Sequence, residues 1–237
     1  MKKQRVFVTG ATGGMGFASL KEMLKDADKQ DIVILARDSE KNRKILAPYM
    51  QTKGLTVVWS DLNDYEVVKK CVKDCDIVLH IAAFVSPAAD YYPDRAMKVN
   101  YGSTRNIIRA IYEHKQQDFT RLVYIGTVAE TGDRMPPIHW GRVGDPIKPS
   151  MFDYYAVSKV AAERLVIESG LKYWVSLRQT GIIGKAMSEI NDAIMFHNCF
   201  DNVLEYCSDR DSARAMKNLC AFYHDGDLPE SFLGAYL

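Results

Sequence analysis

A glycine-rich turn near the amino terminus limits what this chain can fold into more than any other stretch. Residues 5–9 form a short apolar run, and Gly10, Gly13 and Gly16 follow at three-residue intervals. Apolar residues at helical spacing begin at Phe17. Glycine lets the backbone approach a ligand closely, and the free N–H groups at a helix start favour an anion. The order of strand, turn and helix predicts a pyrophosphate cradle. Its G-x-x-G-x-x-G spacing differs from the general G-x-G-x-x-G, so an ordinary glycine turn is the alternative.

The rest of the chain alternates between short apolar runs and amphipathic segments. Further strands are expected at residues 31–37, 55–60, 76–81, 121–127 and 173–177, and helices at 65–73, 94–114 and 152–169, with another starting at Ser39. Such alternation implies right-handed crossovers and an α/β fold with a doubly wound parallel sheet. Because no Ser/Gly-rich linker divides the chain, we expect a single domain over residues 1–237.

The charge balance and cysteine usage exclude several classes of partner. Lys plus Arg is 31 and Asp plus Glu is 30, giving a formal net charge of +1, so neither nucleic acid nor an anionic membrane is expected as a partner. No apolar segment approaches transmembrane length. Five cysteines without a secretory signal indicate reduced thiols and a cytoplasmic setting. Cys71 and Cys75 lack a second ligand pair and are interpreted as structural, so no metal site is predicted.

A Tyr-x-x-x-Lys spacing, which places both side chains on one face of a helix, occurs three times. The pairs are Tyr49/Lys53, Tyr65/Lys69 and Tyr155/Lys159. Only the third pair lies on the helix after the fifth expected strand, and Thr127 supplies a hydroxyl at the carboxyl end of that strand. Ligands of open α/β sheets bind at the carboxyl ends of the strands. We therefore select Tyr155 and Lys159 as catalytic candidates and interpret the other two pairs as surface residues.

The selected pair has the chemistry that proton transfer to a carbonyl requires. A tyrosine with a reference pKa near 10 needs roughly 4 kcal/mol of help to exchange a proton near neutrality. An ammonium about 4 Å away supplies roughly that energy at an effective dielectric near 20. The expectation is that Lys159 lowers the pKa of Tyr155, while Thr127 binds and orients the substrate oxygen.

The end of the second expected strand bears on the cofactor. NAD-binding proteins usually place Asp or Glu there, to bind the ribose hydroxyls, whereas this chain has Arg37 followed by Asp38. A guanidinium suits a 2′-phosphate through charge-assisted hydrogen bonds. The sequence predicts NADP, with NAD as second choice because Asp38 is also available to a ribose. Lys41 and Arg43 either add to the positive field or form a solvated surface run.

These motifs, in this order, resemble the extended short-chain dehydrogenase/reductases of the NAD-dependent epimerase/dehydratase superfamily. The T-G-A-T-G start, the Y-x-x-x-K pair and residues 99–106, similar to V-N-x-x-G-T-x-N, carry the resemblance. It implies a Rossmann fold with Tyr155 as acid/base and Lys159 activating the tyrosine and binding the nicotinamide ribose. It also implies Thr127 as the Ser/Thr member and Asn100 supporting the lysine through water.

The cradle, the second strand and the resemblance together define an expected cofactor-binding set. It comprises Gly10, Thr12, Gly13, Gly14, Met15, Gly16, Arg37, Asp61, Leu62, Ala82, Ala83, Tyr155 and Lys159. Asp61 and Leu62 resemble the adenine-contacting pair, and Ala82 and Ala83 the wall beside the cofactor, with His80 packing structurally before it. The resemblance also implies a homodimer formed through helices 94–114 and 152–169.

The carboxyl-terminal part is expected to supply the substrate site. Residues 180–237 would form most of a small substrate lobe. This lobe looks short or truncated, because the sequence stops at Leu237 where relatives continue. The candidate pocket residues are mostly apolar: Phe84, Val85, Pro87, Met135, Ile138, Trp140, Met151, Phe152, Ile182, Ile183, Met187 and Phe196.

The sequence favours oxidoreduction of a largely apolar small molecule over sugar chemistry. It looks closer to the 3β-hydroxysteroid dehydrogenase and dihydroflavonol reductase subgroup, so the prediction is interconversion of a secondary alcohol and a ketone on a ring substrate such as a steroid. Dehydratases of this fold carry Asp-Glu after the catalytic Thr, where this chain has Val128 and Ala129. A nucleotide-sugar epimerase or reductase stays open, since four cations are available for a diphosphate: Arg134, Arg142, Arg178 and Lys185. The other alternative is a dinucleotide-binding protein without turnover, whose relatives tend to lose the Tyr/Lys pair.

Overall fold

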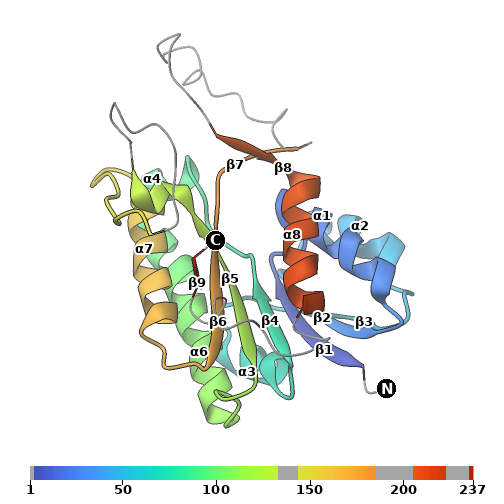
Figure 1. Cartoon of the computed structure of the whole chain (residues 1–237). Coiled ribbons are helices and arrows are strands. Elements are labelled where there is room, and N and C mark those ends of the chain that lie inside the picture. Colours follow the sequence, from blue (N-terminus) through green and yellow to red (C-terminus); the bar gives the residue numbers. More distant parts are fainter. Residues whose placement is uncertain (1–2, 133–143, 185–204, 223–234, 237) are drawn as a thin grey trace.

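A parallel sheet of seven strands forms the centre of the molecule (Figure 1). The computed structural model describes residues 3–132, 144–184, 205–222 and 235–236. The strand order is β3-β2-β1-β4-β5-β6-β9, and every pairing is parallel. The strands are β1 (Gln4–Thr9), β2 (Gln30–Ala36), β3 (Leu55–Trp59), β4 (Ile77–His80), β5 (Arg121–Thr127), β6 (Tyr173–Gln179) and β9 (Ala235–Tyr236). A separate parallel pair joins β7 (Gly181–Ile183) to β8 (Tyr206–Ser208).

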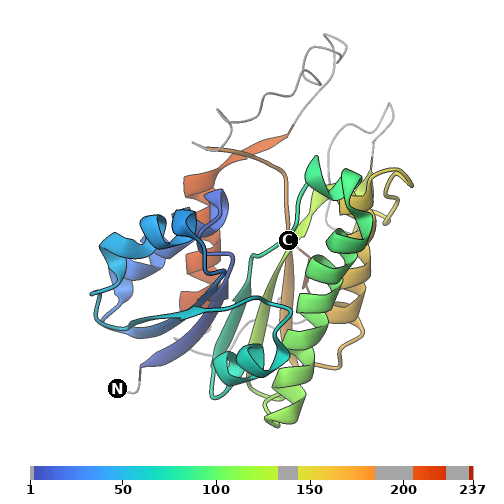
Figure 2. The same ribbon diagram turned by 180° about the vertical axis from the view of Figure 1, so that it is seen from behind.

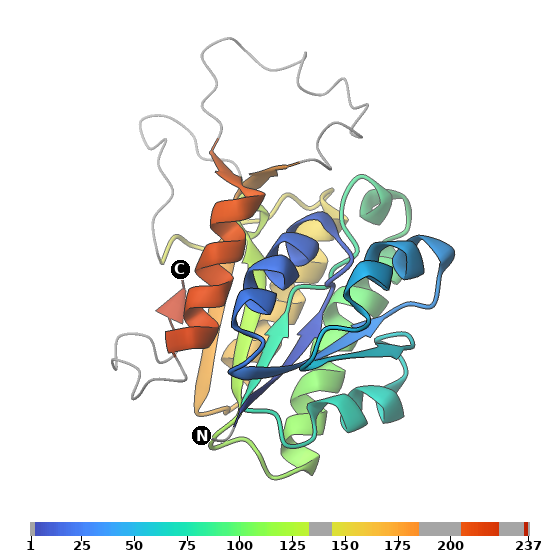
Figure 3. The same cartoon turned by 90° about the vertical axis from the view of Figure 1, so that its right-hand side faces the viewer.

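Helices cover both faces of the sheet, as the doubly wound prediction requires. One layer holds α1 (Gly14–Met23), α2 (Glu40–Leu46) and α8 (Asp209–Phe222), and the other α3 (Tyr65–Val72), α6 (Gly102–Glu113) and α7 (Tyr154–Ile167), as Figures 1 and 3 show. Leu20 of α1 and Met216 of α8 pack in one buried cluster, while Ile107 of α6 and Val166 of α7 pack in another. The two apolar layers explain why the strands are apolar along their whole length.

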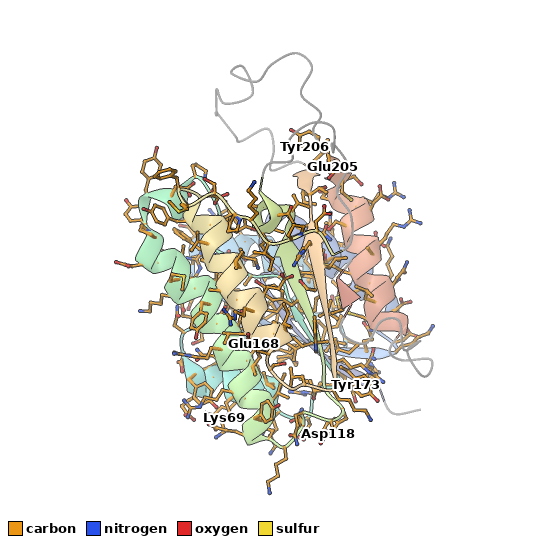
Figure 4. The ribbon with its side chains drawn as sticks, turned by 60° about the vertical axis from the view of Figure 1, so that its left-hand side comes forward. Lys69, Asp118, Glu168, Tyr173, Glu205 and Tyr206 are labelled. Atoms are coloured by element: carbon orange, nitrogen blue, oxygen red, sulfur yellow. The ribbon has the colours of Figure 1, made fainter. Side chains whose placement is uncertain are left out.

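The chain reverses its direction of progress across the sheet between β1 and β4. It runs outward through β2 and β3, then returns to β4 on the other side of β1 and continues through β5 and β6. The two helical layers, seen from behind in Figure 2, separate at this point. A crevice at the carboxyl ends of the strands is expected there. Figure 4 shows the two ends of the sheet. Tyr173, at the start of β6, lies at one end, and Tyr206 of β8 lies toward the other.

The predicted elements are found with shifted boundaries and several additions. The helix expected at 94–114 is α5 (Pro93–Ala96), a π-helical turn η3 (Met97–Tyr101) and α6. The short helix α4 (Ala88–Tyr91), the β7–β8 pair and β9 were not predicted. Other short turns are η1 (Leu24–Asp26), η2 (Ala47–Tyr49) and η4 (Val128–Thr131).

Part of the range 180–237 belongs to the layers of the sheet. Helix α8 packs on α1, where Ser19 Oγ lies 3.4 Å from Met216 Sδ, and Lys217 forms a 2.7 Å ion pair with Asp26. Residues 185–204 and 223–234 of the predicted substrate lobe lie outside the described residues. The lobe therefore stays a prediction.

The described part of the chain contains neither a helix that could span a membrane nor a cluster of metal ligands. Within it, no helix combines the length and the apolar character needed to cross a bilayer. The same residues contain no group of His, Cys, Asp and Glu side chains that could hold a metal ion. Cys71 and Cys75 are buried free thiols in the core, and burial raises their pKa values to about 11 and about 12. They therefore stay protonated and structural at neutral pH.

Candidate functional site

A cavity of about 980 Å³ lies at the carboxyl ends of the strands. Its lining includes all thirteen residues of the expected cofactor-binding set, together with Thr127. They come from the turn after β1, the end of β2, the segments after β3 and β4, the end of β5 and the first turns of α7. The structure thus brings the predicted phosphate cradle and three of the four predicted catalytic residues to one cavity; the fourth, Asn100, does not line it.

The turn after β1 has the close backbone packing that requires glycine. Gly10 has φ of 75°, and a side chain there would place Cβ 2.7 Å from the Ala82 nitrogen. A side chain at Gly16 would collide with the carbonyl oxygen of Gly10. Helix α1 starts after Gly13 without a side-chain cap and without an acidic residue in its first turn. Its N-terminal N–H groups and its dipole therefore face the cavity free to bind an anion, so the residues fit a dinucleotide.

A buried polar chain ties the cradle to the wall opposite it. Thr9 Oγ1 accepts a hydrogen bond from the Ala82 N–H and lies 2.8 Å from Nδ1 of His80, while His80 Nε2 lies 3.1 Å from Thr104 Oγ1. Thr104 donates its hydroxyl proton to the Asn100 carbonyl, so His80 Nε2 carries the ring proton. Burial lowers the pKa of His80 to about 3. The histidine is therefore neutral, and its structural packing was predicted.

At the end of β2, Arg37 lines the cavity while Asp38 is engaged elsewhere. The Asp38 carboxylate accepts two hydrogen bonds from Arg43, at 2.6 and 2.8 Å, and these lower its pKa. Arg43 lies over the Trp59 ring, 4.8 Å from its centroid. Among the described residues, the Arg37 guanidinium has no hydrogen bond or ion pair. Arg37 and Lys41 are therefore the cations that this end of the cavity offers.

The predicted adenine-contacting pair is held by its neighbours. Asp61 Oδ1 accepts hydrogen bonds from the backbone N–H and the side-chain amide of Asn63, at 2.8 and 2.6 Å. The Asn106 amide donates to the Leu62 carbonyl at 3.1 Å. The second asparagine of the V-N-x-x-G-T-x-N segment thus positions this wall of the cavity.

The three predicted catalytic side chains meet at the junction of β5 and α7. Tyr155 is hydrogen-bonded to Thr127, the last residue of β5. The buried Lys159 ammonium donates to the Ile125 carbonyl at 2.6 Å and lies 4.1 Å from the centroid of the Tyr124 ring. The other two Tyr/Lys pairs do not line the cavity. Of the three, only the selected pair reaches it.

The expectation that Lys159 lowers the pKa of Tyr155 is wrong for this structure. Burial raises the pKa of Tyr155 to about 12, outweighing the lowering by the Thr127 hydrogen bond, and nearby Glu130 and Asp153 raise it further. Burial also lowers the pKa of Lys159, against the opposing effect of Glu130 and Glu163. The physical reason is that the ammonium is directed at the Ile125 carbonyl and sits in a medium that disfavours charge.

Asn100 lies behind the cavity wall and connects two elements. The π-helical turn η3 carries it, and such turns are frequent at functional sites. Its side chain accepts from the Phe84 N–H at 2.7 Å and donates to the Phe84 carbonyl at 3.0 Å and to Ser158 Oγ at 2.8 Å. Asn100 thus fastens the segment after β4 to helix α7. Its predicted link to Lys159 through water stays a prediction.

A buried cluster of two carboxyl groups and one guanidinium beneath Thr127 was not predicted. Glu130 Oε1 accepts from the Thr127 N–H at 3.1 Å, and Glu163 Oε2 pairs with Arg178 Nη2 at 2.7 Å. Glu163 also accepts a short hydrogen bond from Ser176. The T-x-x-E spacing of Thr127 and Glu130 is a capping-box pattern and is the signal that would have revealed it. Arg178, proposed as a diphosphate ligand, is paired here and does not line the cavity, which corrects that expectation.

The predicted substrate residues divide into three groups. Phe84, Val85 and Ile182 line the cavity, whereas Pro87, Met151, Phe152 and Ile183 do not. The remainder of that set, with Arg134, Arg142 and Lys185, lies outside the described residues: Met135, Ile138, Trp140, Met187 and Phe196. Arg95 and Lys98 line the cavity unpredicted, with the Arg95 guanidinium 4.9 Å from the centroid of the Phe84 ring.

Comparison with curated proteins gives relatives of several kinds. The chain is 28% identical over 194 residues to the 3 beta-hydroxysteroid dehydrogenase/Delta 5-->4-isomerase of Vaccinia virus (strain Western Reserve), covering 75% of this chain and 52% of the relative. It is 29% identical over 113 residues to the inverting UDP-N-acetylglucosamine 4,6-dehydratase of Campylobacter jejuni, covering 47% of this chain and 34% of the relative. The chain thus spans about half the length, or less, of these relatives.

Comparison with solved structures shows the same fold in sugar-nucleotide enzymes. The dTDP-glucose 4,6-dehydratase of Streptomyces venezuelae, with NAD bound, has a TM-score of 0.76 at 19% identity over 92% of this chain and 72% of that one. The UDP-Glc/GlcNAc 4-epimerase of Campylobacter jejuni has a TM-score of 0.74 at 15% identity, over 94% and 76% of the two chains. The family model described as "NAD dependent epimerase/dehydratase family" matches residues 6–216. The chain belongs to the NAD-dependent epimerase/dehydratase family of extended short-chain dehydrogenase/reductases.

Proposed function

We propose that this chain is an oxidoreductase that interconverts a secondary alcohol and a ketone with a bound nicotinamide dinucleotide. The observation that carries the proposal is the meeting of Thr127, Tyr155 and Lys159 in a cavity that also contains an uncapped helix start. A phosphate cradle alone would suit a binding protein. A phenol hydrogen-bonded to a second hydroxyl at the same cavity supplies a group for proton transfer.

Each side chain has a separate task in this reaction. The nicotinamide, when bound, supplies the hydride chemistry. Thr127 binds and orients the substrate oxygen, and Tyr155 gives a proton to that oxygen in reduction or takes it in oxidation. Lys159 provides positive charge beside the site, and Asn100 holds α7 against the segment after β4. The raised pKa of Tyr155 keeps the phenol protonated at neutral pH, which favours its action as an acid in ketone reduction.

The preferred cofactor of this proposal is NADP, with NAD as second choice. Asp38 is already paired with Arg43, so its carboxylate is less available to a ribose hydroxyl. Arg37 and Lys41 line the cavity at the end of β2 and suit a 2′-phosphate. Relatives that bind NAD do so within the same family, so the preference depends on these residues alone.

The proposed substrate is a largely apolar ring molecule such as a steroid. Phe84, Val85 and Ile182 give the cavity an apolar wall beside the catalytic hydroxyls. The relatives named 3 beta-hydroxysteroid dehydrogenase/isomerase match the longest stretch among the curated proteins compared above.

A nucleotide-sugar epimerase or reductase is the second candidate. The cavity is lined by Arg95 and Lys98, two cations that suit a diphosphate. Val128 and Ala129, in place of Asp-Glu, argue against elimination chemistry.

The proposed assembly is a cytoplasmic homodimer formed through α6 and α7. Val157 and Tyr154 on α7 and Tyr112 on α6 are exposed apolar side chains on these helices. Light scattering at micromolar concentration is the test: a mass near one chain would refute the dimer.

The test of the function follows NADPH absorbance with a panel of hydroxysteroids and ketosteroids, aromatic ketones, aliphatic aldehydes and UDP- and GDP-sugars. Turnover of a steroid or aromatic ketone is expected. Turnover confined to nucleotide sugars would favour the second candidate. Binding of NADPH without turnover of any panel member would favour a dinucleotide-binding protein.

A further inference from the structure

Beneath the catalytic threonine lies the buried carboxyl cluster of Glu130 and Glu163 with Arg178. We infer that Glu130 is a positioning residue: its buried carboxylic acid group accepts the backbone N–H of Thr127 and donates its own proton to Glu163. This inference rests on the proposed function, because it assigns the cluster a role in holding the Thr127 hydroxyl toward the substrate oxygen.

The contacts of Glu130 explain why it acts on Thr127. Thr127 caps the η4 turn by accepting the Ala129 N–H on Oγ1 at 3.2 Å, while Glu130 Oε1 accepts the Thr127 N–H at 3.1 Å. These reciprocal bonds fix both the backbone and the hydroxyl of the last residue of β5. Because Tyr155 is hydrogen-bonded to the same hydroxyl, the position of Thr127 also sets the position of the phenol.

The second oxygen of Glu130 indicates that this acid carries a proton. Oε2 is buried, and no donor among the described residues forms a hydrogen bond to it; the Arg178 Nε atom is 3.6 Å away. Glu163 takes the direct hydrogen bonds of Arg178 and of Ser176. A buried ionised carboxylate without a donor is costly, whereas a protonated one can donate to its neighbour. Two carboxyl groups sharing one proton beside one guanidinium leave the cluster electrically neutral.

The surrounding charges agree with this arrangement. Burial, followed by the neighbouring Glu163, raises the pKa of Glu130, whereas hydrogen bonds from Glu130, Arg178 and Ser176 lower the pKa of Glu163. The groups facing Glu130 are Arg178 from β6, Glu163, Lys159 and Tyr155 from α7, and Tyr124 from β5. The negative charge of an ionised Glu130 is one of the causes that raise the pKa of Tyr155. The proton on Glu130 therefore also limits how far the pKa of Tyr155 rises.

Two substitutions at one position separate the hydrogen bonds from the charge. In Glu130→Gln, the amide oxygen accepts from Thr127 and the NH₂ group donates to Glu163, as the protonated acid does. Glu130→Met has a similar volume but makes neither bond. Glu168→Gln, which removes an exposed carboxylate at the end of α7, the helix that carries Glu163 (Figure 4), is the matched control.

The expected kinetic result is rescue by the conservative variant. Glu130→Gln keeps kcat at pH 7 within about threefold of the wild type, whereas Glu130→Met lowers kcat by roughly tenfold or more, as expected for an unpaired buried N–H at a reacting group. KM for the cofactor stays unchanged in both. The pH profile of kcat for Glu130→Gln lacks one alkaline ionisation that the wild type and Glu168→Gln show. A Gln variant as slow as the Met variant, or a Met variant with wild-type kcat, would overturn the inference.

A second measurement does not depend on turnover. With ¹⁵N-threonine labelling, the Thr127 amide signal, assigned by its loss in Thr127→Ser, should shift with pH in the alkaline range in wild type but not in Glu130→Gln. If Glu130→Met does not fold, the amide titration and the pH profile of kcat for Glu130→Gln still test the role of Glu130. If no substrate is turned over, the proposed function fails but the amide titration still tests the shared proton. An amide signal that is insensitive to pH in the wild type would refute the proton on Glu130.

Discussion

The starts of α1 and of the η4 turn lie at the carboxyl ends of two strands of one sheet. They differ in whether side chains form hydrogen bonds to their first backbone N–H groups. Helix α1 begins after Gly13 with no side-chain cap. The η4 turn begins at Thr127 with a complete capping box to Glu130. Helices α2 and α3, capped by Ser39 and Asp64, resemble the second case.

The difference teaches what each start is for. A helix with glycine at its N-cap is less stable by about 0.3 kcal/mol than one with a capping side chain, and glycine adds backbone entropy that favours unfolding. That cost is consistent with an anionic ligand completing the cap. The η4 turn instead uses its hydrogen bonds internally, which holds the Thr127 hydroxyl rigidly. One start is suited to binding a ligand through the backbone, the other to presenting a side chain.

The largest effect is expected beside the start of the η4 turn, where Thr127 and Tyr155 lie. Tyr155→Phe should lower kcat by about 10²- to 10⁴-fold, the usual range for loss of a general acid, and leave the dissociation constant for the cofactor within a few-fold. The control is Tyr65→Phe on α3, whose ring lies under Arg109 and outside the cavity. A larger loss in Tyr65→Phe than in Tyr155→Phe would show that the wrong Tyr/Lys pair had been selected.

At the binding end, Gly16→Ala should weaken cofactor binding by roughly 10- to 100-fold, since overpacking a tight site costs about 1–3 kcal/mol. The added methyl group would meet the Gly10 carbonyl and push the turn away from its present path. Gly102→Ala is the control, because its nearest neighbours lie 3.8 Å away and its helical φ suits alanine. If calorimetry gives equal cofactor affinities for the wild type and Gly16→Ala, the turn after β1 does not bind the cofactor phosphates.

A smaller effect concerns the choice between cofactors. Arg37→Ala should lower the affinity for NADPH by roughly tenfold, as loss of a charge-assisted hydrogen bond predicts. The affinity for NADH should hardly change. Fluorescence titration of both cofactors into both proteins gives the answer, with Arg164→Ala, an exposed arginine of α7, as the control. Wild-type protein that binds the two cofactors equally would refute the preference for NADP.

A further effect is on the pH dependence of stability, and it is small for each pH unit. An acid whose pKa is raised by folding keeps its proton in the folded state after the unfolded chain has released it, so stability falls as pH rises above about 4.5. Glu130 should contribute a loss of at most about 1.4 kcal/mol per pH unit, and Glu130→Gln should not. As pH rises from 5 to 8, the temperature midpoint of thermal unfolding should therefore fall less in Glu130→Gln than in the wild type. Parallel pH curves would contradict a raised pKa at Glu130.

Local sequence patterns predicted the start of α1 better than the start of the η4 turn and its surroundings. The glycine spacing and the strand before it are contained within one short segment, and β5 was predicted with the boundaries observed because its apolar run is unbroken. The structural packing of His80 was also predicted, from its place at the end of an apolar strand. These features depend on neighbours in the chain.

Features that depend on distant residues were missed or wrong. The pairing of Arg178 with Glu163 joins β6 to α7. The predicted fall in the pKa of Tyr155 failed because spacing on a helix gives neither burial nor the direction of the Lys159 ammonium. The π-helical turn that carries Asn100 has no sequence signature that distinguishes it from a regular helix.

The most direct test of the account gives α1 the cap that it lacks. Gly13 has an extended backbone with φ of −78°, and an added Cβ would come no closer than 3.5 Å to its neighbours, so Gly13→Asp can cap the helix. We predict that this variant unfolds at a slightly higher temperature than the wild type, by a stabilisation of about 0.3 kcal/mol, while calorimetry detects NADPH binding in the wild type only. A Gly13→Asp protein that binds NADPH as tightly as the wild type would contradict the claim that the free start of α1 holds the cofactor phosphates.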